Sequence, residues 1–129
     1  MDENYVSRAE GVIKELKRDR NGRIVLTTSK IRNILSMVSD LYNDAQRYRN
    51  ETLKDDIYDL YRRTQYLKMR MAYEAGRDGN DDVKDFIEKA KLIDEINKVG
   101  RSKAKLLDFC HYMEALVAYH KYYSKKEGI

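Results

Sequence analysis

The sequence contains no proline and no tryptophan, and only 6 of its 129 residues are glycine. Proline and glycine interrupt helices most strongly, so their scarcity favours long helices. A single cysteine, Cys110, cannot form an internal disulfide, which suits a reducing compartment. No uncharged apolar run reaches the roughly 20 residues of a membrane-spanning helix. The first eight residues also lack the apolar core of a signal peptide. We therefore expect a cytoplasmic protein with no membrane association.

Apolar residues recur at helical spacing in five segments of the chain. The expected helices span residues 3–17, 28–48, 51–75, 82–99 and 102–125. Hydroxyl caps at 27–29 and Ser102 mark two of the starts, and Gly76 is read as a C-terminal cap. This pattern predicts an all-α fold, a compact bundle of about five helices with short loops, in a single domain covering residues 1–129.

Two further expectations concern the loop between the first two helices and the core. A basic loop is expected over residues 17–27, with a turn at Asn21-Gly22 and a short extended stretch over residues 24–26. The helix expected over residues 51–75 carries a second stripe, Tyr58, Tyr66, Met69 and Tyr73, which suggests burial on two sides. The apolar stripes should face one core. Four residues are expected to be buried there: Leu35, Leu60, Phe86 and Phe109.

Positive charge is concentrated in two regions of the chain. The formal net charge is only +4, but residues 17–32 and residues 98–126 each carry a net charge of +5. The remainder of the chain is therefore acidic. Concentrated positive charge in an otherwise balanced protein is typical of a nucleic-acid binder.

No set of residues in the sequence forms a convincing catalytic, cofactor or metal site. The chain lacks a Gly-Lys-Ser/Thr phosphate loop. His111 and His120 are nine residues apart and face opposite sides of a helix, and Cys110 is nearly three turns from His120. Glu74 and Glu114 are better read as hydrogen-bonding or ion-pairing groups than as acid–base catalysts. We expect neither enzymatic activity nor a cofactor.

Cations near aromatic residues and helix starts are better candidate contacts for RNA. Lys30 and Arg32 lie in the first turn of a helix, where cations oppose the helix dipole, although simple solvation also explains them. Lys68 and Arg70 alternate with aromatic residues between Tyr66 and Tyr73, and Arg77 follows in the turn. Such cations can follow a phosphate backbone while an aromatic side chain supports a base. The alternative is that the tyrosines and methionines belong to the core and the two cations lie at its rim.

Three segments of the sequence together resemble one protein family. They are Leu-Thr-Thr-Ser-Lys-Ile-Arg-Asn (26–33), Tyr-Leu-Lys-Met-Arg-Met-Ala-Tyr-Glu-Ala-Gly-Arg (66–77) and Phe-Cys-His-Tyr-Met-Glu-Ala-Leu-Val-Ala-Tyr-His-Lys-Tyr-Tyr (109–123). In order and spacing they are similar to the small subunit of the type III-A CRISPR–Cas effector, the Csm complex. The resemblance runs from about residue 26 to residue 123, and it is loose over residues 3–23.

The resemblance implies a helical, non-catalytic subunit of an antiviral complex. Copies of it would form an inner filament that lines the guide RNA–target RNA path, beside the backbone and large subunits of the effector. The resemblance implies that residues in the matching segments contact the target RNA. We expect the RNA contacts to be Lys30, Arg32, Lys68, Arg70 and Arg77. The competing interpretation is a stand-alone adaptor that binds another protein through a tyrosine-rich face, since the chain has 11 tyrosines.

A filament of copies would need two different complementary patches on one molecule. The basic end at residues 121–126 is one candidate patch, with Tyr58, Tyr119, Tyr122 and Tyr123 as aromatic anchors. The other is an acidic tract made of Asp40, Asp44, Glu51, Asp55, Asp56 and Asp59.

Overall fold

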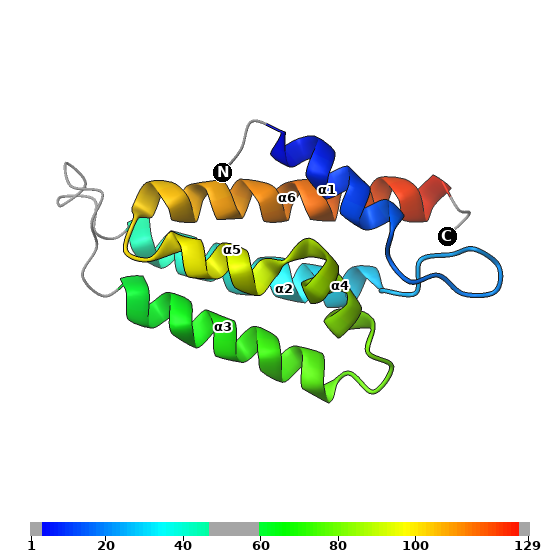
Figure 1. Ribbon diagram of the computed structural model, residues 1–129, viewed down its shortest axis with the longest axis horizontal. Helices are drawn as coiled ribbons and strands as arrows, with labels where there is room; N and C mark the ends of the chain where they lie inside the picture. The colour runs from blue at the N-terminus through cyan, green and yellow to red at the C-terminus, as the bar shows by residue number, and fades with distance from the viewer. Residues whose placement is uncertain (1–3, 47–59, 127–129) are drawn as a thin grey trace.

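A computed structural model describes residues 4–46 and 60–126, the last two by backbone alone. These residues form six α-helices (Figure 1): α1 (Tyr5–Lys14), α2 (Thr28–Ala45), α3 (Leu60–Arg77), α4 (Asp82–Ala90), α5 (Leu92–Val99) and α6 (Lys103–Lys126). The only β pairing within these two ranges is an isolated antiparallel bridge between Arg18 and Ile24. The predicted all-α fold is confirmed.

The helices are arranged in three rows (Figure 1). The long helix α6 and α1 lie along one edge, and α2, α4 and α5 form the middle of the molecule. Helix α3 lies along the opposite edge, packed against α2, α4 and α5. The outer side of α3 is therefore not covered by another helix of the described part of the chain.

The core lies between these rows and contains most of the residues expected there. Leu60, Phe86 and Phe109 are almost completely buried. Leu35 was predicted to be buried, but it is only partly buried. The reason is geometric: Ile34 and Val38 take the inward positions of α2, and Leu35 is rotated from Ile34 by about 100° around the helix axis.

Two predicted helix starts have the expected caps. The Thr27 hydroxyl accepts a hydrogen bond from the backbone N–H of Lys30 at 3.3 Å, and the Ser102 hydroxyl accepts one from that of Lys105 at 3.1 Å. Each cap satisfies a backbone donor that has no partner within its helix.

The expected boundaries were wrong at three places. The first helix ends at Lys14 rather than residue 17, and Gly76 lies inside α3, which continues to Arg77. The segment predicted as one helix over residues 82–99 is two helices, because Lys91 has a left-handed backbone with φ 55°. The hydroxyl of Tyr112 donates a hydrogen bond to the Ala90 carbonyl at 2.9 Å, which satisfies a backbone acceptor at the break. The last two residues of the helix predicted over 28–48, and residues 51–59 of the helix predicted over 51–75, lie outside the described residues.

No helix within the described ranges combines the length and apolar character needed to cross a membrane.

Candidate nucleic-acid interface

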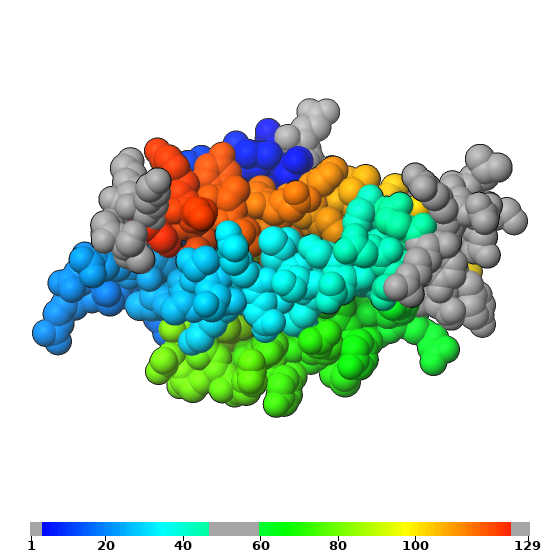
Figure 2. All heavy atoms as spheres, turned by 180° about the vertical axis from the view of Figure 1, so that it is seen from behind, coloured from blue at the N-terminus to red at the C-terminus, as the bar shows by residue number. Residues whose placement is uncertain are grey.

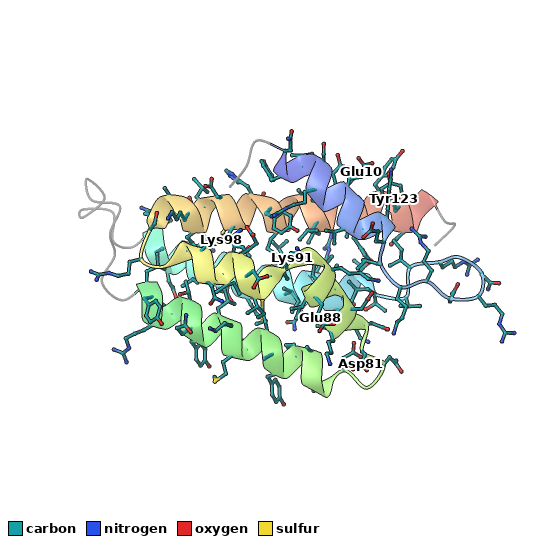
Figure 3. The ribbon with its side chains drawn as sticks, in the orientation of Figure 1. Glu10, Asp81, Glu88, Lys91, Lys98 and Tyr123 are labelled. Atoms are coloured by element: carbon teal, nitrogen blue, oxygen red, sulfur yellow. The ribbon has the colours of Figure 1, made fainter. Side chains whose placement is uncertain are left out.

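The outer face of α3 carries a row of exposed aromatic, thioether and basic side chains. Arg62, Tyr66, Met69 and Tyr73 are spaced by four, three and four residues, so they lie on one stripe of the helix. Tyr66, Met69 and Tyr73 are 59%, 58% and 67% exposed. Figure 3 shows the side chains along this edge of α3 pointing away from the other helices. We call Arg62, Tyr66, Met69, Arg70, Tyr73 and Arg77 the α3 face.

The exposure of this row contradicts the prediction that α3 is buried on two sides. Its inward positions are filled by Leu60, Thr64, Leu67 and Met71, and α3 lies at the edge of the bundle, so only one side meets other helices. The alternative that these tyrosines and methionines belong to the core is therefore wrong for Tyr66, Met69 and Tyr73. The fourth member of the predicted stripe, Tyr58, lies outside the described residues.

The arginines of α3 lie on the side of the helix toward α2. Arg70 is exposed and makes no ion pair or hydrogen bond with another described residue. With Arg62, Arg63 and Asp44 it lines a cavity of about 680 Å³ between α2 and α3. Arg63 forms an ion pair with Asp44 across this cavity. The sequence interpretation missed Arg62 and Arg63, although the seven-residue spacing of Arg63, Arg70 and Arg77 places all three near one stripe.

Lys68 lies on the other flank of α3. It is two residues before Arg70, which rotates the two side chains apart by about 200°. Its ammonium donates a hydrogen bond to the Asn97 side chain of α5 at 3.2 Å. Lys68 therefore lies at the rim of the bundle, as one of the two alternatives anticipated, bonded to α5. Arg70 instead lines the cavity between α2 and α3.

Lys30 and Arg77 line one smaller pocket of about 220 Å³, at the end of α3 and the start of α2. The Lys30 ammonium donates to an Asp78 carboxylate oxygen at 2.9 Å and lies 3.9 Å from Asp82. Arg77 donates to Glu74 at 2.8 Å, and its side chain remains 62% exposed. Lys30 is therefore already engaged within the protein, whereas Arg77 keeps most of its surface accessible.

Asp78 holds Lys30 and the start of α4 together. One carboxylate oxygen accepts from Lys30, and the other accepts from the backbone N–H of Val83 at 2.9 Å. The hydrogen bond from Lys30, aided by that from Val83, lowers the pKa of Asp78 to about 2 from an ordinary value of 3.8. The folded structure therefore stabilises the ionised form of the Asp78 carboxylate.

Arg32 lies apart from the other candidate residues. It is exposed, and a separation of two residues rotates it by about 200° from Lys30 around α2. It does not line the pocket that contains Lys30 and Arg77. The five predicted RNA contacts therefore do not form one site. Arg70 and Arg77 share the α3 face, Lys30 is adjacent to Arg77, and Lys68 and Arg32 point elsewhere.

Three of the residues considered for catalysis or metal binding are buried or hydrogen-bonded within the fold. His120 is buried, and its Nε2 lies 2.7 Å from the Leu26 carbonyl oxygen. Glu74 accepts hydrogen bonds from Asn33 and Arg77. Burial raises the pKa of the Cys110 thiol to about 12. Among the residues that the structure describes, no three His, Cys, Asp or Glu side chains come together as a metal-binding group.

Comparison with known proteins places the chain in a family. A family model described as Csm2 Type III-A matches residues 2–126. The chain is 40% identical to the CRISPR system Cms protein Csm2 of Streptococcus thermophilus over 98% of its own length and 96% of that protein's. It is 41% identical to the protein of that name from Mycobacterium tuberculosis (strain CDC 1551 / Oshkosh), over 98% and 97%. It is 42% identical to the one from Enterococcus italicus, over 89% and 86%. The chain therefore belongs to the Csm2 family, the small subunit of type III-A CRISPR systems.

Proposed function

We propose that this protein is a non-catalytic, RNA-binding subunit of a cytoplasmic Csm effector complex. In this proposal, copies of it form an inner filament that lines and stabilises the guide RNA–target RNA path in antiviral defence. Its protein partners are the backbone and large subunits of the complex and neighbouring copies of itself. Guide and target select one another by base pairing, so the subunit needs to hold phosphates and unstacked bases without reading their sequence.

The observation that carries this proposal is the composition of the α3 face. Tyr66 and Tyr73 are exposed on the same edge as Arg70 and Arg77. Aromatic rings can stack on bases of any sequence, and guanidinium groups bind phosphates with two parallel hydrogen bonds. An exposed row of both is suited to a single-stranded or locally unpaired RNA. We assign Arg70 and Arg77 as the principal contacts on the α3 face. Lys30, Lys68 and Arg32 lie off this face, and we propose them as secondary contacts.

RNA binding by the isolated subunit should be weak, independent of sequence and strongly dependent on salt. The measurement is fluorescence anisotropy with a labelled single-stranded RNA over a range of salt concentrations. We expect Arg70→Gln to reduce the slope of log affinity against log salt by roughly 0.7, the loss of one phosphate contact. Lys91→Gln removes the same charge from an exposed residue away from the α3 face and is the matched control. The RNA should remain intact after the titration, with or without divalent metal.

The start of α2 needs a separate variant. Reversing the charge of Lys30 together with that of Arg32 would also break the ion pair with Asp78, so a loss of binding would not be specific. Arg32→Glu leaves that pair in place. Unchanged binding in Arg32→Glu would remove Arg32 from the contacts, and unchanged binding in Arg70→Gln would contradict the assignment of the α3 face.

Self-association between copies is proposed to join the basic end of α6 to the acidic tract. In the basic end, Lys121 and Tyr122 are exposed. In the acidic tract, Asp40 is exposed, whereas Asp44 forms an ion pair with Arg63. Residues 51–59 of the tract and the side chains of residues 125 and 126 lie outside the described part. Charge reversal at Lys121, Lys125 and Lys126 should lower the number of small subunits in purified complexes without changing the melting temperature of the isolated protein. Unchanged occupancy would place the contact elsewhere.

The α3 face also suits the alternative of a protein-binding adaptor, because exposed tyrosines and methionines are common at protein interfaces. The salt titration separates the two. An RNA interface loses affinity steeply with salt, whereas a partner held by Tyr66 and Tyr73 would be retained at high salt and released by Tyr66→Ala.

A further inference from the structure

The loop between α1 and α2 is a preformed hairpin that projects from one end of the molecule. Figures 1 and 2, which view the molecule from opposite sides, both show the loop extending beyond the bundle near the end of α6. Its two arms are joined by the bridge between Arg18 and Ile24 and by a hydrogen bond from the Val25 N–H to the Lys17 carbonyl at 3.1 Å. We call residues 17–26 the basic hairpin.

Asp19 closes the tip of the basic hairpin. One of its carboxylate oxygens accepts from the backbone N–H groups of Asn21 at 2.8 Å and Arg23 at 3.0 Å. Its own backbone N–H donates to the Arg23 carbonyl at 2.8 Å, and its carbonyl accepts from the Gly22 N–H at 3.0 Å. Gly22 adopts a φ of 79°, which glycine tolerates without steric penalty. The turn is thus fixed by several bonds that converge on one residue.

The base of the basic hairpin is fixed to the bundle. Ile24 and Leu26 are 5% and 3% exposed, and the Leu26 carbonyl lies against His120 of α6. The Lys17 ammonium forms an ion pair with Asp82 at 3.0 Å and donates to the Asn80 carbonyl at 2.8 Å. The hairpin therefore cannot swing freely about its ends.

Two arginines at the tip are available to a ligand. Arg20 and Arg23 are exposed, and neither side chain has an ion-pair or hydrogen-bond partner within residues 4–46 and 60–126. The carboxylate nearest in sequence, Asp19, accepts from backbone donors through one oxygen and forms no ion pair with either guanidinium group. Arg18, by contrast, donates a hydrogen bond from its guanidinium group to the Gly22 carbonyl at 2.7 Å.

We infer that the tip of the basic hairpin is a second RNA contact, in which Arg20 and Arg23 bind backbone phosphates. The inference rests on the proposed function, because it adds a contact to the same RNA. Phosphate is favoured over a protein partner because residues 18–23, which form the tip, include no apolar side chain. At the base, Ile24 and Leu26 are buried in the core and Val25 is half-buried. The tip therefore lacks the apolar or aromatic anchor that dominates most protein interfaces. The fixed turn holds the backbone of both arginines in place, so binding has to order only their side chains.

The first test compares salt-dependent RNA binding of the full chain and Arg20→Gln/Arg23→Gln. The probes are a labelled single-stranded RNA and its duplex with a complementary strand. Because two phosphate contacts are lost, we expect affinity to fall on the order of ten-fold and the salt slope for the single strand by roughly 1.4. A selective loss with either probe supports the inference and identifies the form of RNA that is bound. Lys91→Gln/Lys105→Gln, which removes two charges from other exposed positions, should have a much smaller effect.

The second test isolates the fixed geometry of the turn from its charge. Asp19→Asn and Asp19→Ala both remove one negative charge, but only asparagine keeps a side-chain oxygen that can accept from Asn21 and Arg23. We expect Asp19→Asn to bind RNA at least as tightly as the wild type, and Asp19→Ala to bind several-fold more weakly than Asp19→Asn. Equal affinities for the two variants would contradict a role for the preformed turn.

The outcomes separate this inference from the proposed function. If the wild type binds RNA with steep salt dependence and Arg20→Gln/Arg23→Gln binds equally well, the inference is wrong and the proposed function stands. If that variant binds RNA normally but is lost from assembled complexes, the hairpin contacts protein and the RNA assignment is wrong. If the wild type binds no RNA alone or in the complex, both fail.

Discussion

At the scale of single residues, the basic side chains divide into those engaged within the fold and those that remain available. Lys17 and Lys30 both reach the carboxylates at the start of α4, where they join three segments of the chain. Arg70, Arg20 and Arg23 have no such partners in the described part of the chain. The two kinds look identical in sequence, because the carboxylate that engages Lys30 is 48 residues away.

The pair between Lys30 and Asp78 should appear in the acid stability of the protein. The pKa of Asp78 is lowered from 3.8 to about 2, so its contribution to stability is complete above pH 4 and is lost as the pH falls through 2. Asp78→Asn keeps an acceptor for the Val83 N–H and removes the charge. We expect this variant to have a lower melting temperature at pH 7 and the difference from the wild type to vanish toward pH 2. Asp40→Asn, at an exposed carboxylate, is the control.

A constant difference between Asp78→Asn and the wild type from pH 7 to pH 2 would contradict this account. It would mean that the asparagine disturbs the start of α4 by its shape rather than by the loss of charge.

At the scale of helices, the sequence predicted the order of the helical segments, but not where they end or that the segment over residues 82–99 is divided into α4 and α5. Periodic apolar residues identify α2, α3 and α6, since each must bury one face. The break at Lys91 has no local signal, because neither glycine nor proline is near it. The hydrogen bond from Tyr112 to the Ala90 carbonyl, which joins residues 22 apart in the sequence, helps to accommodate the break. In the same way, periodicity marked Tyr66 and Tyr73 as apolar but could not tell that α3 lies at the edge of the bundle.

The left-handed backbone at Lys91 offers a stability prediction. The left-handed conformation costs a residue with a side chain roughly 1 kcal/mol of conformational free energy, a cost that glycine does not have. We expect Lys91→Gly to raise the free energy of unfolding by about 0.5–1 kcal/mol, after allowing for the greater freedom of glycine in the unfolded chain. Chemical denaturation measures this change. Lys91→Ala removes the same side-chain charge without relieving the backbone and should not stabilise the protein.

A stabilisation of equal size in Lys91→Ala and Lys91→Gly would contradict the strain argument. It would show that the lysine charge, and not the backbone conformation, is unfavourable at the junction of α4 and α5.

At the scale of the whole molecule, the exposed arginines proposed as RNA contacts on the α3 face and on the basic hairpin lie on two separate surfaces. One surface is the edge formed by α3, and the other is the end from which the basic hairpin projects (Figures 1 and 2). The sequence indicated both regions through the charge of residues 17–32 and through the cations among aromatic residues. It could not distribute the five candidate contacts between surfaces, because that depends on how α2 and α3 are rotated in the bundle.

The central claim, that the α3 face lies against RNA, is tested most directly by ultraviolet crosslinking in the assembled complex, followed by mass spectrometry. Stacked aromatic residues are in direct contact with bases, so Tyr66 or Tyr73 should carry a nucleotide adduct when target RNA is bound. The adducts should weaken in Arg70→Gln and disappear in the absence of RNA. Adducts found only on other surfaces of this subunit, with the α3 peptides recovered unmodified, would contradict the account.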